Sequence, residues 1–135
     1  MTPLAIEKVL QLRSGEGIAA CGRIPEESEF FKDHFPGFPV LPGVLALEML
    51  KQTAEHYLRL TGDHPRRRFS LKQIRAAKFS RYLKPGDEWQ SHLELLREEG
   101  GRSDWNGRLL HGERVAVSAR LTLEAVRVPE ALRVS

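Results

Sequence analysis

Apolar and polar residues alternate almost one by one near the end of the chain. Between Val115 and Leu123 every second residue is apolar and most of its neighbours are polar, which is typical of a strand with one buried face. The segment Ile6–Leu12 is compatible with either a strand or a helix. Turns rich in glycine and proline bound the apolar stretches, and the pattern predicts strands at Leu4–Leu12, Gly17–Ile24, Phe69–Phe79, Glu88–Glu98, Ser103–Leu110 and Arg114–Val126.

One segment repeats its apolar residues every three or four positions and therefore predicts a helix. It runs from Val44 to Leu60, and the segment Thr61–Asp63, followed by Pro65, supplies a stop signal. Extra apolar residues in the first turns predict that this end is buried on nearly every side. The positions that follow the helical period are Leu47, Leu50, Ala54, Tyr57 and Leu58.

One predicted helix among many predicted strands indicates an α+β domain. The length of 135 residues fits one compact domain, residues 1–135. Because the strands outnumber the helices, the most economical packing is a curved antiparallel sheet wrapped around the helix.

The N-terminus and the hydropathy pattern indicate a cytoplasmic protein. Met1–Arg13 lacks a basic leader followed by an apolar core, and no apolar run reaches the length of a membrane span. The single cysteine, Cys21, cannot form an internal disulfide and has no partner for a CxxC motif. We expect Cys21 to act as a small, half-buried hydrophobic residue.

The formal net charge is only +3, but basic residues gather in one stretch. Such a cluster suits an acidic protein partner. Aromatic residues that would stack nucleic-acid bases are few and are not interleaved with it, so we expect no nucleic-acid binding. The alternative is a solvated edge strand whose basic side chains discourage aggregation. The cluster comprises Arg66, Arg67, Arg68, Lys72, Arg75, Lys78, Arg81 and Lys84.

The segment from Asp33 to Glu48 carries the candidate chemistry. Its three prolines restrict the backbone, so a loop here would hold His34 in one place. Pro42 and Gly43 lead directly into the predicted helix, whose first N–H groups and positive dipole end could stabilise an oxyanion. Glu48 lies in the second turn among apolar residues, where burial would favour its protonated form. Together His34 and Glu48 form a candidate acid/base pair.

Each of these residues also has a purely structural interpretation. Glu48 could pair with Lys51 or hydrogen-bond Gln52, three and four residues further along the helix. His34 could satisfy backbone groups of its own turn. The ordered combination within one short segment favours the catalytic interpretation.

The motif consists of His34-Phe35-Pro36-Gly37, Pro39, Pro42-Gly43-Val44-Leu45, Glu48 and Gln52. It is followed by Ala77-Lys78-Phe79 and Leu83-Lys84-Pro85-Gly86-Asp87. These residues resemble the signature of the FabZ-type (3R)-hydroxyacyl-acyl carrier protein dehydratases. The resemblance covers roughly Ile6 to Val126 and implies a hotdog fold, in which a curved sheet wraps one long helix.

The resemblance also implies a mechanism and partners. His34 is expected to act as general base and Glu48 as general acid, facing each other across a dimer interface, with the Gly43 N–H as oxyanion donor. The implied assembly is a homodimer or a trimer of dimers. No metal or cofactor is implied, because the substrate arrives on the phosphopantetheine of an acyl carrier protein, which the basic cluster could dock. The expected acyl tunnel residues are Phe35, Phe38, Pro42, Val44, Met49 and Gln52.

Some features depart from the family pattern. Met49 and Lys51 stand where small alanines are usual, and a Leu-Pro-His-Arg-like segment has no counterpart ahead of the first strand. These differences favour a narrower, more polar tunnel mouth and a specialised acyl substrate, such as one of a polyketide-like or aryl-polyene pathway. Two alternatives remain open: an acyl-thioester hydrolase that uses Glu48 to activate water, and a non-catalytic acyl-binding hotdog subunit.

Overall fold

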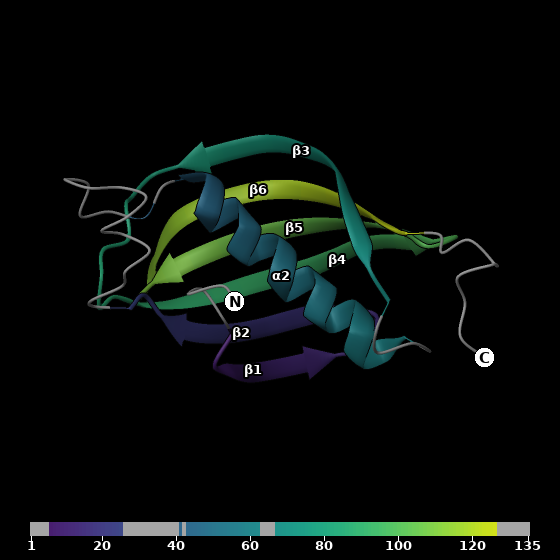
Figure 1. Ribbon diagram of the computed structural model, residues 1–135, viewed down its shortest axis with the longest axis horizontal. Coiled ribbons are helices and arrows are strands. Elements are labelled where there is room, and N and C mark those ends of the chain that lie inside the picture. The colour runs from purple at the N-terminus through teal and green to yellow at the C-terminus, as the bar shows by residue number, and fades with distance from the viewer. Residues whose placement is uncertain (1–5, 26–40, 42, 63–66, 127–135) are drawn as a thin grey trace.

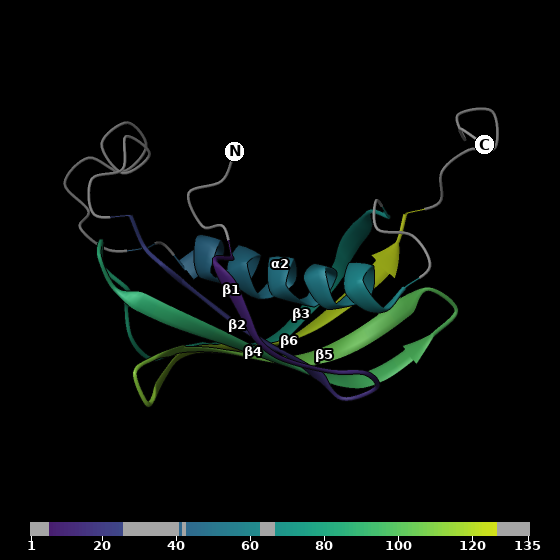
Figure 2. The ribbon, with the colours of Figure 1, turned by 90° about the horizontal axis from the view of Figure 1, so that it is seen from below.

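Six antiparallel strands form one curved sheet, and a single long helix of the described chain crosses its concave side (Figures 1 and 2). The computed structural model describes residues 6–25, 41, 43–62 and 67–126. The strand order is β1-β2-β4-β5-β6-β3, so β1 and β3 are the edge strands. The elements are β1 (Lys8–Arg13), β2 (Gly17–Arg23), α2 (Gly43–Thr61), β3 (Phe69–Phe79), β4 (Glu88–Glu99), β5 (Arg102–His111) and β6 (Arg114–Ala125).

The predicted α+β architecture is therefore confirmed, and the helix begins and ends within one residue of the predicted bounds. The helical alternative for Ile6–Leu12 is wrong, because Lys8–Arg13 pairs with β2 as a strand. The part of the first predicted strand that precedes Ile6 lies outside the described residues.

Two-residue turns join the central strands as the glycine pairs predict. Gly100 and Gly101 connect β4 to β5, and both have positive φ values, 60° and 82°. Positive φ at both central residues gives a turn whose twist matches that of the flanking strands, and glycine adopts it without steric cost. The glycine pair therefore sets the β4–β5 register.

The core lies between α2 and the concave face of the sheet. Tyr57 of α2 packs edge-on against Trp105 of β5, with ring centroids 5.1 Å apart and planes at 78°. The Tyr57 hydroxyl also accepts a hydrogen bond of 2.7 Å from the Gly15 N–H, which ties the β1–β2 turn to the helix. In the same layer between α2 and the sheet, the buried hydroxyl groups of Thr53 and Ser91 share a hydrogen bond of 2.6 Å, so this polar pair is satisfied.

The alternation predicted for the last strand is correct over most of its length. Val117, Ala119, Leu121 and Leu123 are all buried towards α2. A register shift between Leu109 and Leu110 of β5 interrupts the pattern at the start of β6. The extra residue is Ala116, whose carbonyl accepts hydrogen bonds from Ser80 and Arg81. This bulge fixes the chain where it leaves β3, next to the start of α2.

Candidate active site

The start of α2 is held against the end of β3 and the segment that follows it. The Leu41 N–H donates a hydrogen bond of 2.6 Å to the Leu83 carbonyl, and both side chains are buried. The Phe79 ring lies on the first helical residue, because a Cβ built on Gly43 would be 2.7 Å from Phe79 Cε1. Glycine at position 43 thus allows the aromatic ring to approach the helix backbone closely.

The same segment also holds the end of β2. The Ile24 N–H donates to the Asp87 carbonyl at 2.8 Å, and the Gly86 N–H donates to the Ile24 carbonyl at 2.7 Å. Ile24 and Leu41 lie on either side of the stretch 26–40, which falls outside the described residues. Both flanking positions are therefore attached to the segment between Leu83 and Asp87.

Glu48 lies in the second turn of α2 and is half-buried. Its Oε1 accepts a hydrogen bond of 3.4 Å from Gln52 Nε2. Lys51 forms its ion pair with Glu55 instead, at 3.5 Å, and Glu55 also binds Arg59 at 3.0 Å. Of the two structural partners expected for Glu48, the structure shows Gln52 and not Lys51. Within the described residues the Glu48 carboxyl group forms no ion pair, and Gln52 is its hydrogen-bond partner.

Some of the other predicted site residues are described by the structure, and some are not. Val44 is 69% exposed, so the expectation that the first helical turns are buried on nearly every side is wrong at this position. Met49 is 1% exposed and packs in the core, and Gln52 is half-buried beside Glu48. The remaining predicted residues, His34, Phe35, Phe38, Pro42 and Arg66, lie outside the described residues.

The described members of the basic cluster lie before β3, on β3 and after it. All of its described members are exposed, but Lys84 closes the turn before β4, where its N–H binds the Asp87 carboxylate at 2.8 Å. Arg67 precedes β3, and its carbonyl accepts a hydrogen bond from Arg59. Arg75 and Lys78 are paired with outward-facing residues of β6. The linear cluster is therefore divided among different parts of the molecule.

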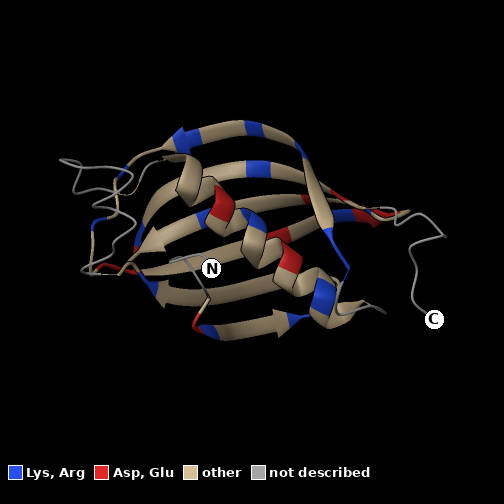
Figure 3. Ribbon diagram, viewed as in Figure 1, with Lys and Arg blue, Asp and Glu red and all other residues tan. Residues whose placement is uncertain are grey.

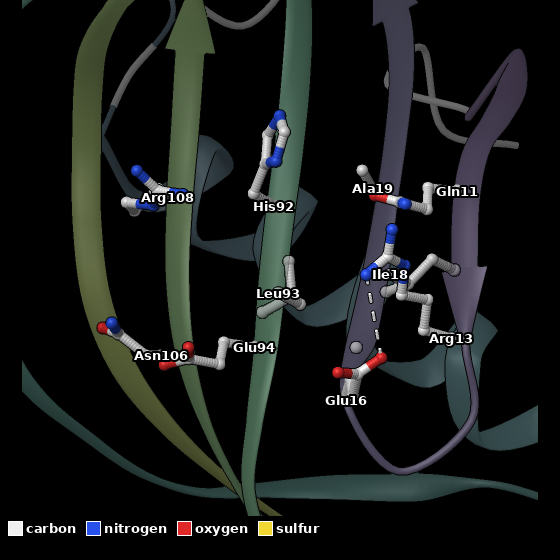
Figure 4. A pocket seen from close by; sticks show the side chains of 11 residues that line it. Gln11, Arg13, Glu16, Ile18, Ala19, His92, Leu93, Glu94, Asn106 and Arg108 are labelled. Atoms are coloured by element: carbon white, nitrogen blue, oxygen red, sulfur yellow. Dashed lines mark ion pairs between the residues drawn. The ribbon is translucent and has the colours of Figure 1, made fainter.

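A hollow of about 490 Å³ lies on the face of the sheet opposite to α2 (Figure 4). Arg13, Glu16, His92, Glu94 and Arg108 line it, and none of them was predicted as a site residue. Partial burial, together with the Arg108 charge, lowers the pKa of His92 below its ordinary value of 6.5. Because the sheet separates this hollow from Gly43 and Glu48, it is not the candidate active site.

Two kinds of residue could not be identified from the sequence alone. Phe79 belongs to a segment that matches the family, but only the structure shows its ring on Gly43. Arg108 and Arg120 lie outside the linear basic cluster, and strand pairing brings them near it. The polar positions in the predicted alternation of β6 could have indicated Arg120 as an outward-facing residue.

The described part of the chain has neither a metal-binding cluster nor a membrane-spanning helix. It holds no group of three or more histidine, cysteine, aspartate or glutamate side chains placed to bind a metal ion. Its helix is too polar to cross a membrane.

A long helix with a half-buried carboxyl group, wrapped by a six-stranded antiparallel sheet, defines a hotdog-fold protein with a candidate acid/base site. The family model described as ApeI-like, ApeI dehydratase, matches residues 11–118. The chain belongs to this family of dehydratases and is thus a hydro-lyase. The predicted relationship to FabZ-type dehydratases is confirmed.

Curated relatives agree with this assignment. The chain is 34% identical to the 3-hydroxyacyl-[acyl-carrier-protein] dehydratase FabZ of Levilactobacillus brevis, over 88% of this chain and 80% of that protein. It is also 34% identical to the enzyme of the same name from Variovorax paradoxus, over 87% of this chain and 81% of that protein.

Solved structures share the fold. The dehydratase heterocomplex ApeI:P from Xenorhabdus doucetiae superposes with a TM-score of 0.77 at 17% identity, over 94% of this chain and 86% of that chain. A probable thioesterase from Bartonella henselae superposes with a TM-score of 0.64 at 20% identity, over 85% of this chain and all of that chain. At these identities the likeness establishes the hotdog fold and no particular reaction.

Proposed function

We propose that the protein removes water from (3R)-3-hydroxyacyl thioesters, carried on an acyl carrier protein, to give trans-2-enoyl thioesters. The observation that carries this proposal is Glu48: a carboxyl group in the second turn of the central helix, without a cationic partner in the described chain and bound by Gln52. Two curated relatives with 34% identity bear the name of such a dehydratase.

The reaction needs two proton transfers on neighbouring carbon atoms. His34 takes the proton from C2 as the general base, since a neutral imidazole accepts a proton near neutral pH. Glu48 donates a proton to the C3 hydroxyl group, which leaves as water. The Gly43 N–H at the start of α2 stabilises the negative charge that develops on the thioester oxygen. These steps require no metal or cofactor.

We propose that two copies pair through β3 and so bring His34 of one subunit to Glu48 of the other. β3 is an edge strand of 11 residues, and an edge strand presents unpaired backbone groups. Ile74 and Phe79, on its helix-facing side, are 39% and 47% exposed, and Val44 and Tyr82 are each 69% exposed. Such apolar side chains at one edge fit burial against a second copy.

The experiment that tests the reaction is an absorbance assay of enoyl thioester formation on 3-hydroxyacyl thioesters of increasing chain length. Glu48→Gln keeps the shape of the side chain and its position beside Gln52 but removes the acid. We expect turnover to fall by about 10²–10⁴-fold, the usual contribution of a positioned general acid. Glu98→Gln, an exposed position of β4, is the matched control and keeps wild-type turnover.

Wild-type turnover in Glu48→Gln would remove this residue from the mechanism. Free thiol released by the wild type, without enoyl product, would indicate a thioester hydrolase instead. A protein that binds the acyl thioester and converts none of the series would be the non-catalytic subunit.

A further inference from the structure

The last residue of β3, Phe79, lies against the first residue of α2 (Figure 1). A Cβ built on Gly43 would be 2.7 Å from Cε1 of the Phe79 ring, 3.1 Å from Cδ1 and 3.3 Å from Cζ. One side of the ring therefore occupies the space that a side chain at position 43 would fill. On the neighbouring strand β6, the partner of Phe79 is Val117, which is buried towards the helix.

A bulge in β3 turns Phe79 towards the helix. Ile74, five positions before Phe79, is paired with Leu121, a buried residue of the helix-facing side. Residues an odd number of positions apart in a regular strand point to opposite faces, so a regular β3 would point Phe79 away from α2. The register shifts by one residue around Ala76, whose φ is 52°, a costly conformation for a residue with a Cβ. Bulges and strained backbone occur preferentially where a strand re-aims a functional side chain.

Backbone hydrogen bonds hold the chain on both sides of this contact. The two residues after Phe79 donate their N–H groups to the Ala116 carbonyl, at 2.8 and 3.2 Å. Ahead of the helix, the Leu41 N–H donates to the Leu83 carbonyl at 2.6 Å. The ring and the start of α2 therefore have fixed positions relative to each other.

The first turn of α2 offers only backbone groups for polar contacts. None of residues 43–47 is charged, and Glu48 is the first charged residue of the helix (Figure 3). The N–H groups of a first turn have no carbonyl partner within their own helix, and a phenyl ring is only a weak hydrogen-bond acceptor. The ring therefore does not compete for the Gly43 N–H, but it keeps water from one side of it. Where water is excluded, a hydrogen bond to a developing negative charge is stronger.

Core packing alone does not explain the position of Phe79. Leu41, Leu83 and Val117, the buried apolar residues at this end of the molecule, are at most 3% exposed, whereas Phe79 is 47% exposed. A side chain that served only the core would be covered as these three are. Pairing of subunits through β3 would use the exposed part of the ring and leaves its contact with Gly43 unexplained.

We propose that Phe79 is a positioning residue for the dehydration: its ring fixes the Gly43 N–H and shields it from water, so that this group meets the thioester oxygen as negative charge develops there. This inference rests on the proposed function and adds to it a residue of the edge strand. A displaced or hydrated donor stabilises the charged transition state less, whereas binding of the neutral substrate depends little on it.

The first test measures kcat and KM on a 3-hydroxyacyl thioester of N-acetylcysteamine. Phe79→Ala should lower kcat by about tenfold with KM unchanged, less than the 10²–10³-fold that loss of a whole oxyanion donor costs. Phe79→Tyr keeps the ring and should recover kcat. Leu96→Ala truncates another apolar side chain, 48% exposed on β4, and is the matched control with wild-type kcat. Because Phe79 also lies at the proposed subunit interface, the variants are compared at concentrations at which sedimentation equilibrium gives the wild-type molar mass.

The second test uses the contact itself. Gly43→Ala places a methyl group against the ring and should lower kcat, because the helix start or the ring must move. In Gly43→Ala/Phe79→Ala the methyl group occupies part of the space that the ring has left, so kcat should rise above that of Gly43→Ala alone. Residues that act through one contact give non-additive effects, and additive losses in the double variant would overturn the inference.

Wild-type kcat in Phe79→Ala, or a change of KM with kcat unaltered, would also overturn it. A wild type that converts no 3-hydroxyacyl thioester would contradict the proposed function instead. The Gly43 amide resonance of ¹⁵N-labelled protein then decides the positioning role, during titration with the saturated acyl thioester, which has no hydroxyl group to lose. A downfield shift of this amide proton in the wild type and Phe79→Tyr but not in Phe79→Ala supports the inference, and equal behaviour of the wild type and Phe79→Ala overturns it.

Discussion

The pKa of His92 depends on the charges of the sheet face opposite to α2. The imidazole ring is partly buried beside Arg108, and desolvation and the Arg108 charge both disfavour its protonated form. The folded protein therefore binds a proton at this site less readily than the unfolded chain does. Consequently acidification through the ordinary pKa of 6.5 and down to the lowered pKa reduces the contribution of this group to stability.

Replacing Arg108 by Gln should raise the pKa of His92 towards 6.5 without restoring it fully, because desolvation is the larger cause. The measurement is an NMR titration of the histidine ring resonances in both proteins. Arg102→Gln, which removes another exposed arginine of β5, serves as the control and should leave the His92 titration unchanged. An unchanged His92 titration would show that the Arg108 charge does not reach the ring.

At this scale the sequence predicts identities better than contacts. The helical spacing leaves Lys51 and Gln52 as the possible partners of Glu48, but it does not indicate which of the two forms the contact. The choice depends on Glu55, which attracts Lys51 from one turn further along α2. The exposure of Val44 could not be predicted either, because an apolar side chain near an edge strand is covered only when another surface meets it.

The pairing of β2 with β4 depends on one residue, Gly17. Its φ of 153° and its close approach to the backbone of β4 leave no room for a side chain: a Cβ would overlap the Leu93 carbonyl and lie 3.2 Å from Glu94 Cα. Backbone atoms in a paired strand cannot rotate away as a side chain can. Gly17 is thus required by the contact between two strands.

Gly17→Ala should therefore lower the free energy of unfolding by about 2–4 kcal/mol, since strain and overlap add. Gly15→Ala is the matched control two residues away, with a φ of 81° but no atoms within 4 Å of the added Cβ. It should cost only the conformational strain, about 1 kcal/mol. Urea denaturation of both variants measures the difference, and equal losses would refute the role of the Leu93 contact.

The elements themselves could largely be predicted from the pattern of residues. The bounds of α2 follow from its apolar period, and the glycine turns locate the hairpins. The bulges could not be predicted, because an extra residue in a strand changes the face of its successors without changing the composition. The bulge at Ala76 is the clearest example, since it alone decides that Arg75 and Lys78 share a face.

At the scale of the whole sheet, the described residues form two edge strands with different surroundings. β1 and β3 both expose apolar side chains, Leu10 at 44% and Ile74 at 39%. Only β3 lies beside the start of α2, where Phe79 contacts the helix. If the subunits pair through β3, a charge at Ile74 is buried in the interface, whereas a charge at Leu10 stays in water.

We expect Ile74→Glu to shift the protein from dimer to monomer. Its dehydratase activity should fall over the same range of protein concentration in which the dimer dissociates. Leu10→Glu should remain dimeric and active. Sedimentation equilibrium gives the molar mass of each variant, and activity is measured at the same concentrations. A dimeric, fully active Ile74→Glu, or a monomeric Leu10→Glu, would place the interface elsewhere.

The fold class, the wrapped helix and the family could all be predicted from the sequence, because alternation and motif order are properties of the chain itself. The grouping of Arg75, Lys78, Arg108 and Arg120 on one face of the sheet could not, since these residues lie on three strands and come together only through long-range pairing. A surface that depends on the register between strands is therefore harder to predict from the sequence than the strands themselves.

The edge-on contact of Tyr57 with Trp105 gives the protein an intrinsic optical signal. The chain has two tryptophans, and both are buried in the core. Tyrosine at this distance transfers its excitation energy to the indole, so Tyr57 should contribute almost no emission of its own in the native protein. When the helix leaves the sheet, the two rings separate and the indoles meet water, so tyrosine emission appears and the tryptophan emission moves to longer wavelength. Fluorescence therefore reports directly on the packing of α2 into the curved sheet.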